Sequence, residues 1–218
     1  TLMRDNNMTD VSKLQQYFML RLTDILAKYG KRPAVWNEAI DGGRLSADTR
    51  VYGWEDVKEC RVAAGEYQTV VMPGEYFYFD MKQSAREPGH DWAAIFDWTK
   101  VYGFSLTAQG FTLDEQSKVL GFEGSFFSEA YASRNPESPD YLHYQTFPRL
   151  VALAEISWVN SDERNESLFY DRLINHYDRL DAMGVAYRLM PPKMVYKGGV
   201  LSVSTDDGSS VYYRREPM

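Results

Sequence analysis

The chain has 218 residues, a formal net charge of −7, and a composition that is 44% hydrophobic and 25% charged. This length suffices for one large domain, or for one domain with part of another, and the composition is that of an ordinary globular protein. The negative charge and the lack of a Lys/Arg cluster argue against a nucleic-acid partner, since phosphate backbones bind to basic surfaces. The sequence has no run of eighteen apolar residues, so we expect no membrane partner either.

Metal and cysteine chemistry are not expected from this sequence. Cys60 is the only cysteine, which excludes an intrachain disulfide and a cysteine-rich metal site. The histidines His90, His143 and His176 lie far apart, and none has the spacing of metal ligands. We therefore expect neither a metal nor a cofactor. The unusual feature is an aromatic content of 15%, because large aromatic side chains fill cores and also form flat walls on which sugar rings stack.

The first predicted element is an amphipathic helix over residues 11–29. Apolar residues recur there at spacings of three and four, and Thr9 or Asp10 is placed to cap the start. Gly30, followed by Pro33, indicates where the helix stops. The predicted apolar face consists of Val11, Leu14, Phe18, Leu22, Ile25 and Tyr29.

Four short apolar stretches further along the chain predict buried strands. They are residues 32–39, 49–54, 67–74 and 118–127. Strands that are apolar throughout, with helical pieces such as 55–64 between them, are typical of a parallel sheet covered on both faces. The stretch from 74 to 117 is long, aromatic and irregular, and a loop of that length inside a domain is usually functional.

Two helices are predicted in the C-terminal third. The first covers residues 143–158, and the second is capped by Asn165 and ends at Gly184. The expected buried faces are Phe147, Leu150, Ala154 and Trp158 in the first helix, and Phe169, Leu173, Tyr177 and Leu180 in the second.

The pattern changes to β-structure after Pro191-Pro192. Residues 200–204 and 211–214 flank the turn-forming "TDDGSS" and predict a β-hairpin. We therefore expect residues 1–190 to belong to one domain and residues 191–218 to begin a truncated C-terminal β-domain. A strap across the preceding domain is the alternative, because a lone hairpin is marginally stable in water.

Each predicted strand finishes on aromatic or acidic residues. The carboxyl ends of parallel strands meet at one edge of a sheet, where α/β proteins bind their ligands. Aromatic walls with a few carboxylates suit a sugar, whose ring faces stack and whose hydroxyls need acceptors. We therefore predict a sugar site at this edge. The residues at the strand ends are Trp36, Asn37, Glu38, Trp54, Glu55, Tyr76, Tyr78, Asp80, Phe127 and Glu129.

Six motifs, between about residues 11 and 190, are "AVWNEA", "VYGW", "VVMPGEYFYFD", "EPGHDWAA", "VLGFEGSFFSE" and "FPRLVALAEISW". In this order they resemble the family 20 glycoside hydrolases, the β-N-acetylhexosaminidases, and above all the bacterial chitobiase-like branch. The resemblance implies an α/β fold, a (β/α)8 TIM barrel, of which this chain would hold only the second half, about strands five to eight. It also implies a retaining enzyme that removes terminal N-acetylglucosamine or N-acetylgalactosamine during chitin or glycan degradation.

The resemblance further implies how the substrate's acetamido group would be bound. Trp36 and Trp54 match tryptophans that wall the acetamido pocket. Tyr78 matches the catalytic tyrosine that hydrogen-bonds the acetamido carbonyl oxygen, which then attacks the anomeric carbon. Phe127 stands where the family usually has a tryptophan, and its smaller ring implies a looser pocket.

Other matched residues imply contacts to the sugar hydroxyls and the leaving group. Asp80 and Glu129 match carboxylates that hold hydroxyls of the non-reducing sugar, and Trp92 matches a tryptophan that stacks on the leaving-group sugar. Arg149 and Glu155 match a helix motif that we interpret as structural. From the residues alone, Asp80 and Glu129 could also be an acid/base pair, but nothing in the sequence shows the apolar surroundings that raise a carboxylate's pKa.

The family's acid/base is the glutamate of an adjacent Asp-Glu pair, and no such pair precedes residue 11. Asp114-Glu115 lies in the irregular segment, where the family does not place it. We therefore expect this chain to supply pocket walls without the proton transfer, and to be inactive alone. Its expected partners are an oligosaccharide ending in N-acetylhexosamine and either the missing N-terminal half or a second copy, through exposed strand edges. The substrate class indicates a periplasmic, cell-surface or secreted location.

The alternatives are a catalytically silent N-acetylhexosamine-binding module and an unrelated α/β enzyme. Residues beside the predicted site have simpler interpretations. Glu38 and Glu55 are expected to cap or to form a salt link at the rim, and His90 to be a solvated loop residue. Tyr76 is expected to pack rather than to bind.

Overall fold

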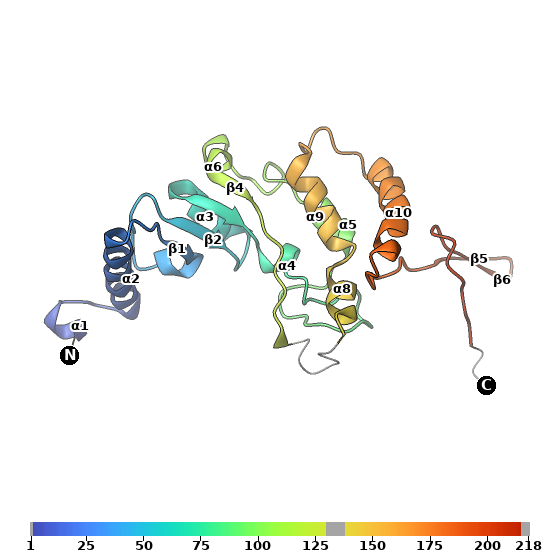
Figure 1. The fold of residues 1–218 in the computed structure, drawn as a ribbon, viewed down its shortest axis with the longest axis horizontal. Helices are drawn as coiled ribbons and strands as arrows, with labels where there is room; N and C mark the ends of the chain where they lie inside the picture. The colour runs from blue at the N-terminus through green and yellow to red at the C-terminus, as the bar shows by residue number, and fades with distance from the viewer. Residues whose placement is uncertain (1, 130–137, 215–218) are drawn as a thin grey trace.

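The structure is a computed structural model that describes residues 2–129 and 138–214. The molecule is elongated, with α2 beside the sheet at one end and a β-hairpin at the other (Figure 1). The helices are α1 (Leu2–Asp5), α2 (Val11–Lys28), the 3₁₀ helix η1 (Asn37–Ile40), α3 (Val57–Glu66), α4 (Gly74–Phe77), α5 (Trp98–Tyr102), α6 (Leu113–Lys118), α8 (Asp140–Thr146), α9 (Arg149–Trp158) and α10 (Glu166–Ala182). The strands are β1 (Ala34–Trp36), β2 (Arg50–Gly53), β3 (Gln68–Val71), β4 (Val119–Phe122), β5 (Lys193–Lys197) and β6 (Val200–Ser204).

Strands β1 to β4 form one parallel sheet in the order β1-β2-β3-β4. The four predicted strands and their parallel arrangement are confirmed, although each strand has only three or four residues. Trp36 pairs with Tyr52, and Val71 pairs with Phe122, so the carboxyl ends of the strands meet at one edge. Within the described residues, β1 and β4 are the edge strands of this sheet.

Helix α3 covers one face of the sheet by packing on β2 and β3. Val51 and Val71 are fully buried on that face. The approach is close at Gly53, where a Cβ would lie 2.7 Å from Cys60 Sγ, and the Cys60 thiol donates to Gly53 O at 3.1 Å. Tyr52, which points to the opposite face, is only half-buried. The sequence predicted a sheet covered on both faces, but within the described residues only one face is covered.

The segment between β3 and β4 is more ordered than the sequence indicated. It contains α4, α5 and α6, and Phe77 and Phe104 from this segment pack edge-to-face at 4.9 Å in the core. Thr112 and Glu115 form a capping box that begins α6. Asp114 pairs with Lys118 within the same helix. The Asp114-Glu115 pair therefore serves α6.

The helix predicted over 143–158 is two helices, α8 and α9, separated at Pro148. A proline has no N–H to donate and holds the preceding residue in an extended conformation, which ends α8. The predicted face is also wrong, because Leu150 is 38% exposed and Trp158 is 89% exposed. Helix α9 instead buries its other side, which consists of Arg149, Ala152, Leu153 and Ile156.

Helices α2 and α10 are both confirmed. Asp10 caps α2 by accepting from Lys13 N, and Asn165 caps α10 by accepting from Leu168 N. All four residues of the predicted face of α10 are at most 3% exposed. The α2 helix, in contrast, has no buried residue.

The C-terminal hairpin uses a different turn from the predicted one. β5 pairs antiparallel with β6 around Gly198-Gly199, while residues 211–214 form no strand. Both glycines have positive φ, which a tight two-residue turn between twisted strands requires. Every residue of the hairpin strands is exposed, and the hairpin projects from the end of the molecule (Figure 1). Among the described helices, none combines the length and the apolar character needed to cross a bilayer.

Candidate active site

A cavity of about 570 Å³ lies at the carboxyl edge of the parallel sheet. All seven predicted site residues line it, and two further residues join them. The lining residues are Trp36, Glu38, Trp54, Tyr78, Asp80, His90, Trp92, Phe127 and Glu129. The structure thus brings together side chains from strand ends and loops that are up to 93 residues apart, counted from Trp36 to Glu129.

Backbone pairing beyond the strands carries Tyr78 and Asp80 to the cavity. Tyr78 and Ser125 form a parallel bridge, with Phe79 N donating to Ser125 O at 2.6 Å and Ser125 N donating to Phe77 O at 2.9 Å. The sheet therefore continues past β3 and β4 at this point. As a consequence, the loop after β4 delivers Phe127 against Tyr78.

Tyr78 is the centre of an aromatic cluster. Its ring is nearly parallel to Trp54, with 6.1 Å between centroids and 14° between planes. Trp92 meets it almost at a right angle, at 5.8 Å and 81°, and Phe127 is tilted by 47° at 5.1 Å. Trp36 packs edge-on against Tyr52 at 5.9 Å. Aromatic faces, several of which meet at steep angles, thus form the apolar walls of the cavity, called here the aromatic box.

The turn after β1 determines where Trp54 lies. Asn37 is 2% exposed, and its side-chain oxygen accepts from Trp54 N at 3.0 Å while its amide donates to Glu55. Glu38 Oε2 accepts from the indole Nε1 of Trp54 at 2.8 Å. Glu38 was predicted to be a cap or a salt link, and this prediction is wrong. It lines the cavity at the strand edge where the sequence placed it, but its bond to the indole of Trp54 has no signal in the sequence.

Asp80 is the buried carboxylate of the cavity, at 1% exposure. Burial raises its pKa, while the charges of His90 and Arg149 act in the opposite direction. Its Oδ1 has no hydrogen-bond partner among the described residues. The structure therefore supplies the apolar surroundings that the sequence did not reveal. A buried, unpaired oxygen facing a cavity is an acceptor for a ligand hydroxyl. Glu129, in contrast, is exposed.

Two neighbouring predictions have opposite outcomes. His90 is not a solvated loop residue, because it is half-buried and lines the cavity. Its backbone N donates to Asp80 O at 2.8 Å, which ties the loop to the cavity floor. Tyr76 packs, as predicted, with its ring 5.0 Å from Phe104. Its hydroxyl accepts from Gln109 outside the cavity.

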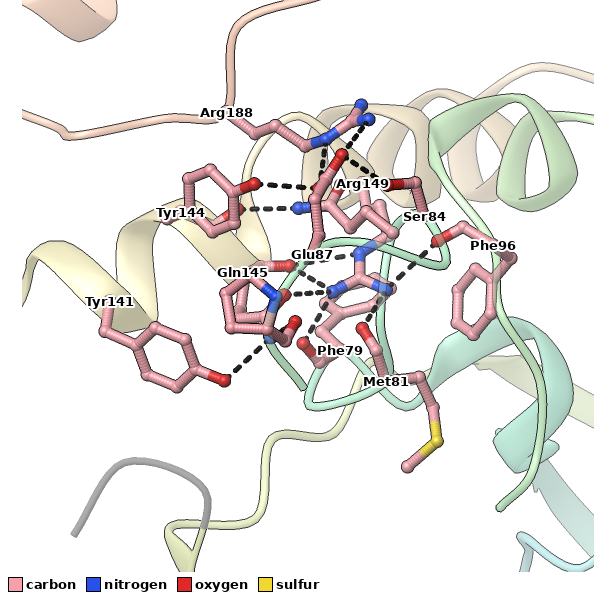
Figure 2. A network of polar contacts seen from close by, with 12 residues as sticks. Phe79, Met81, Ser84, Glu87, Phe96, Tyr141, Tyr144, Gln145, Arg149 and Arg188 are labelled. Atoms are coloured by element: carbon pink, nitrogen blue, oxygen red, sulfur yellow. Dashed lines mark hydrogen bonds and ion pairs between the residues drawn. The ribbon is translucent and has the colours of Figure 1, made fainter. Parts of the chain in front are cut away.

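Behind the cavity, Arg149 holds the backbone on both sides of Asp80 (Figure 2). Its guanidinium is fully buried and donates to Phe79 O at 2.6 Å and to Met81 O at 3.0 Å. It also donates to Gln145 O at the end of α8. Burial lowers the pKa of Arg149 to about 9. The contacts agree with the structural role expected for this residue, and Glu155 of the same motif pairs with Arg172.

An ion pair between Arg188 and Glu87 fixes the loop that carries His90 and Trp92. Arg188 donates twice to Glu87, at 2.7 Å each, and Tyr144 and Ser84 donate to the same carboxylate (Figure 2). Burial would raise the pKa of Glu87, but these hydrogen bonds outweigh it and lower the pKa to about 2. The loop is therefore anchored on α8 and on the segment after α10. In the described ranges, no group of three His, Cys, Asp or Glu residues could hold a metal ion.

The profile of "Glycosyl hydrolase family 20, catalytic domain" matches residues 1–161. The chain belongs to glycosyl hydrolase family 20. It is 29% identical over 222 residues to a β-hexosaminidase of Porphyromonas gingivalis, covering 99% of this chain and 27% of that protein. It is 26% identical to the human β-hexosaminidase subunit beta, covering 82% of this chain and 30% of that subunit. The chain thus spans less than a third of these relatives' length.

Solved family 20 structures share the fold. A Vibrio harveyi exo β-N-acetylglucosaminidase in complex with N-acetylglucosamine matches with a TM-score of 0.75 and 31% identity, over 86% of this chain and 29% of that one. A Streptomyces coelicolor β-N-acetylhexosaminidase matches with a TM-score of 0.70 and 26% identity, over 80% of this chain and 36% of that one. These neighbours imply that the α/β fold of this chain is that of a TIM-barrel catalytic domain.

Proposed function

We propose that this chain supplies the sugar-binding side of a retaining exo-β-N-acetylhexosaminidase, which hydrolyses terminal N-acetylglucosamine or N-acetylgalactosamine. The observation that carries the proposal is the aromatic box around Tyr78, with the unpaired oxygen of Asp80 beside it. The names of the relatives support the same activity. Because many such substrates lie outside the cytoplasm, we also propose a periplasmic, cell-surface or secreted location.

In this proposal, the acetamido group enters the cavity between Trp36, Trp54 and Phe127, where its methyl group contacts flat apolar faces. Tyr78 donates its hydroxyl hydrogen to the acetamido carbonyl oxygen. Burial raises the pKa of Tyr78, followed in effect by the charge of Asp80, so the phenol stays protonated and remains a donor. The acetamido oxygen then attacks the anomeric carbon, and the enzyme supplies orientation in place of its own nucleophile.

The carboxylates and Trp92 bind the rest of the substrate. Asp80 and Glu129 accept hydrogen bonds from hydroxyls of the non-reducing sugar. The unpaired oxygen of Asp80 is the strongest support for this role. Trp92 is 60% exposed, so its ring is available to stack on the leaving-group sugar. Asp80 as an acid/base with Glu129 is the weaker alternative: its burial favours that role, but Glu129 lies exposed and offers no matching environment.

We propose that an Asp-Glu pair outside this chain transfers the proton. The carboxylates in the cavity lining, Glu38, Asp80 and Glu129, come from three separate segments, and Asp114-Glu115 serves α6. A catalytically silent N-acetylhexosamine-binding module is the second candidate, favoured by the same observation. Both candidates require N-acetylglucosamine to bind in the cavity.

Calorimetric titration of this chain with N-acetylglucosamine tests the shared requirement. We expect saturable binding that Tyr78→Phe and Asp80→Ala each weaken by about tenfold, because each change removes one buried hydrogen bond to the ligand. Glu66→Gln on the surface is the matched control. We also expect no turnover of an aryl N-acetylglucosaminide by this chain. Turnover that Glu129→Gln abolishes would contradict the assignment, and absence of binding would remove both candidates.

We further propose that β1 to β4 correspond to strands five to eight of the barrel. Two observations support this correspondence: the parallel order of the strands, and the share of each solved neighbour that the chain covers. The proposal predicts that the edges of β1 and β4 are unpaired in the isolated chain, which favours instability or association with a second copy or a complementary fragment. Sedimentation that shows a cooperatively folded, stable monomer would contradict it.

A further inference from the structure

We propose that Glu38 is a positioning residue for the acetamido pocket, which it controls by fixing the rotation of the Trp54 indole. The inference rests on the proposed function and adds a specificity-determining residue to it. Glu38 Oε2 accepts from Trp54 Nε1 at 2.8 Å, and both residues line the cavity. A hydrogen bond to an ionised carboxylate is shorter and stronger than one between neutral groups.

Trp54 is held at its backbone as well as at its ring. Asn37 Oδ1 accepts from Trp54 N at 3.0 Å, and Asn37 is buried. The two holding residues, Asn37 and Glu38, open the 3₁₀ helix η1, which follows Trp36 directly. One turn therefore presents the first tryptophan wall itself and fixes the second tryptophan wall, Trp54, through two hydrogen bonds.

The ring angle of Trp54 matters because this ring is a wall of the cavity beside Tyr78 and Trp92. Trp54 lies 14° from the plane of Tyr78 and 74° from the plane of Trp92. Rotation of the indole about its χ2 torsion, which has broad minima, would change both angles and the width of the box. The bond to Glu38 opposes this rotation, since a rotated indole would lose this hydrogen bond.

An ordered wall should discriminate between acyl groups of different size. A box of fixed width accepts an acetyl group and rejects a propionyl group by steric conflict, whereas a wall that rotates can accommodate the extra methylene. We therefore expect Glu38→Ala to weaken N-acetylglucosamine binding about tenfold and to reduce the preference for N-acetyl over N-propionyl glucosamine. Glu38→Gln keeps an oxygen acceptor and should stay within about threefold of wild type.

The direct test is a ¹H–¹⁵N correlation spectrum of the five tryptophan indoles of the full 218-residue chain, with Trp54 assigned by its loss in Trp54→Phe. We expect the Trp54 N–H signal to be shifted downfield and protected from exchange in wild type and in Glu38→Gln. In Glu38→Ala it should move upfield and exchange faster. Glu66→Ala, which removes a surface carboxylate paired with Arg44, is the control and should leave it unchanged.

A double-mutant cycle separates positioning from general destabilisation. If Glu38 acts through the indole N–H, Glu38→Ala should cause no further loss of affinity in a Trp54→Phe background. Equal losses in both backgrounds, or an unchanged Trp54 signal in Glu38→Ala, would overturn the inference. A wild-type chain that binds no N-acetylglucosamine would instead refute the proposed function, while the indole spectrum would still report on Glu38.

Discussion

Helices α10 and α2 differ in what covers them. The four apolar residues of α10 are buried in the core, where Phe169 stacks on Tyr102 of α5 with 4.6 Å between centroids and Tyr177 stacks on Tyr187 with 4.2 Å between centroids. The α2 helix contacts the rest of the described chain through polar groups: Gln15 donates to Glu38 O and Gln16 to Arg44 O, both at 3.2 Å. Its apolar residues Phe18 and Ile25 remain 59% and 48% exposed. Periodicity therefore predicts a helix and its apolar face, but a neighbouring element decides whether that face stabilises the fold.

The largest effect on stability is expected at Arg149, which lies in the buried core at the start of α9. Arg149→Met should lower the free energy of unfolding by about 4 kcal/mol, because the carbonyls of Phe79, Met81 and Gln145 lose their buried donor. The stability of Arg149→Lys should lie between that of this variant and that of wild type, since an ammonium cannot donate to all of these carbonyls at once. Urea unfolding followed by circular dichroism measures both. A loss below 1 kcal/mol for Arg149→Met would show that water replaces the guanidinium.

A matched pair of leucines tests the comparison between the helices directly. Leu173→Ala in α10 should cost about 3 kcal/mol, because Leu173 is 1% exposed and its removal leaves a cavity. Leu22→Ala in α2 should change stability by less than about 0.5 kcal/mol, because Leu22 is 37% exposed. Thermal unfolding of both variants at several protein concentrations provides the measurement. Similar losses that grow with concentration would show that α2 is covered by a second copy in solution.

A smaller effect than those at Arg149 and Leu173 is the pH dependence of stability that arises from Glu87. Its pKa in the folded chain is about 2, below the usual 4.5, so its contribution is present above about pH 4.5 and lost as the pH falls towards 2. We expect about 1 to 2 kcal/mol, because water partly screens the pair with Arg188. Glu87→Gln should be less stable than wild type at pH 6 and equal to it near pH 2. A difference between the two that is independent of pH would contradict this assignment.

The sequence predicted the sheet and the carboxyl-edge cavity well, for one physical reason. Strand Arg50–Gly53 runs parallel to its neighbours, so the aromatic or acidic residue that follows it lies at the same rim as the residues that follow them. This logic placed Trp54, Asp80 and Phe127 at one edge before any tertiary contact was known. Their roles towards a substrate stay predictions.

Other features depended on contacts that no local pattern records. The bond between Glu38 and Trp54, and the presence of His90 in the cavity, depend on separate segments that meet there. The buried face of α9 follows from the break at Pro148, a signal that was present in the sequence but was outweighed by the apolar spacing. The hairpin turn could have been found in the adjacent Gly198-Gly199, since both positions need positive φ.

The close approach of β2 and α3 has a practical consequence. Cys60 is fully buried against Gly53, and burial raises the pKa of its thiol to about 12. A thiol in that state reacts with alkylating reagents only while the surrounding structure is open. Because Cys60 is the single cysteine of the chain, its rate of alkylation measures how often α3 separates from the sheet. Mass spectrometry detects this alkylation without any introduced label.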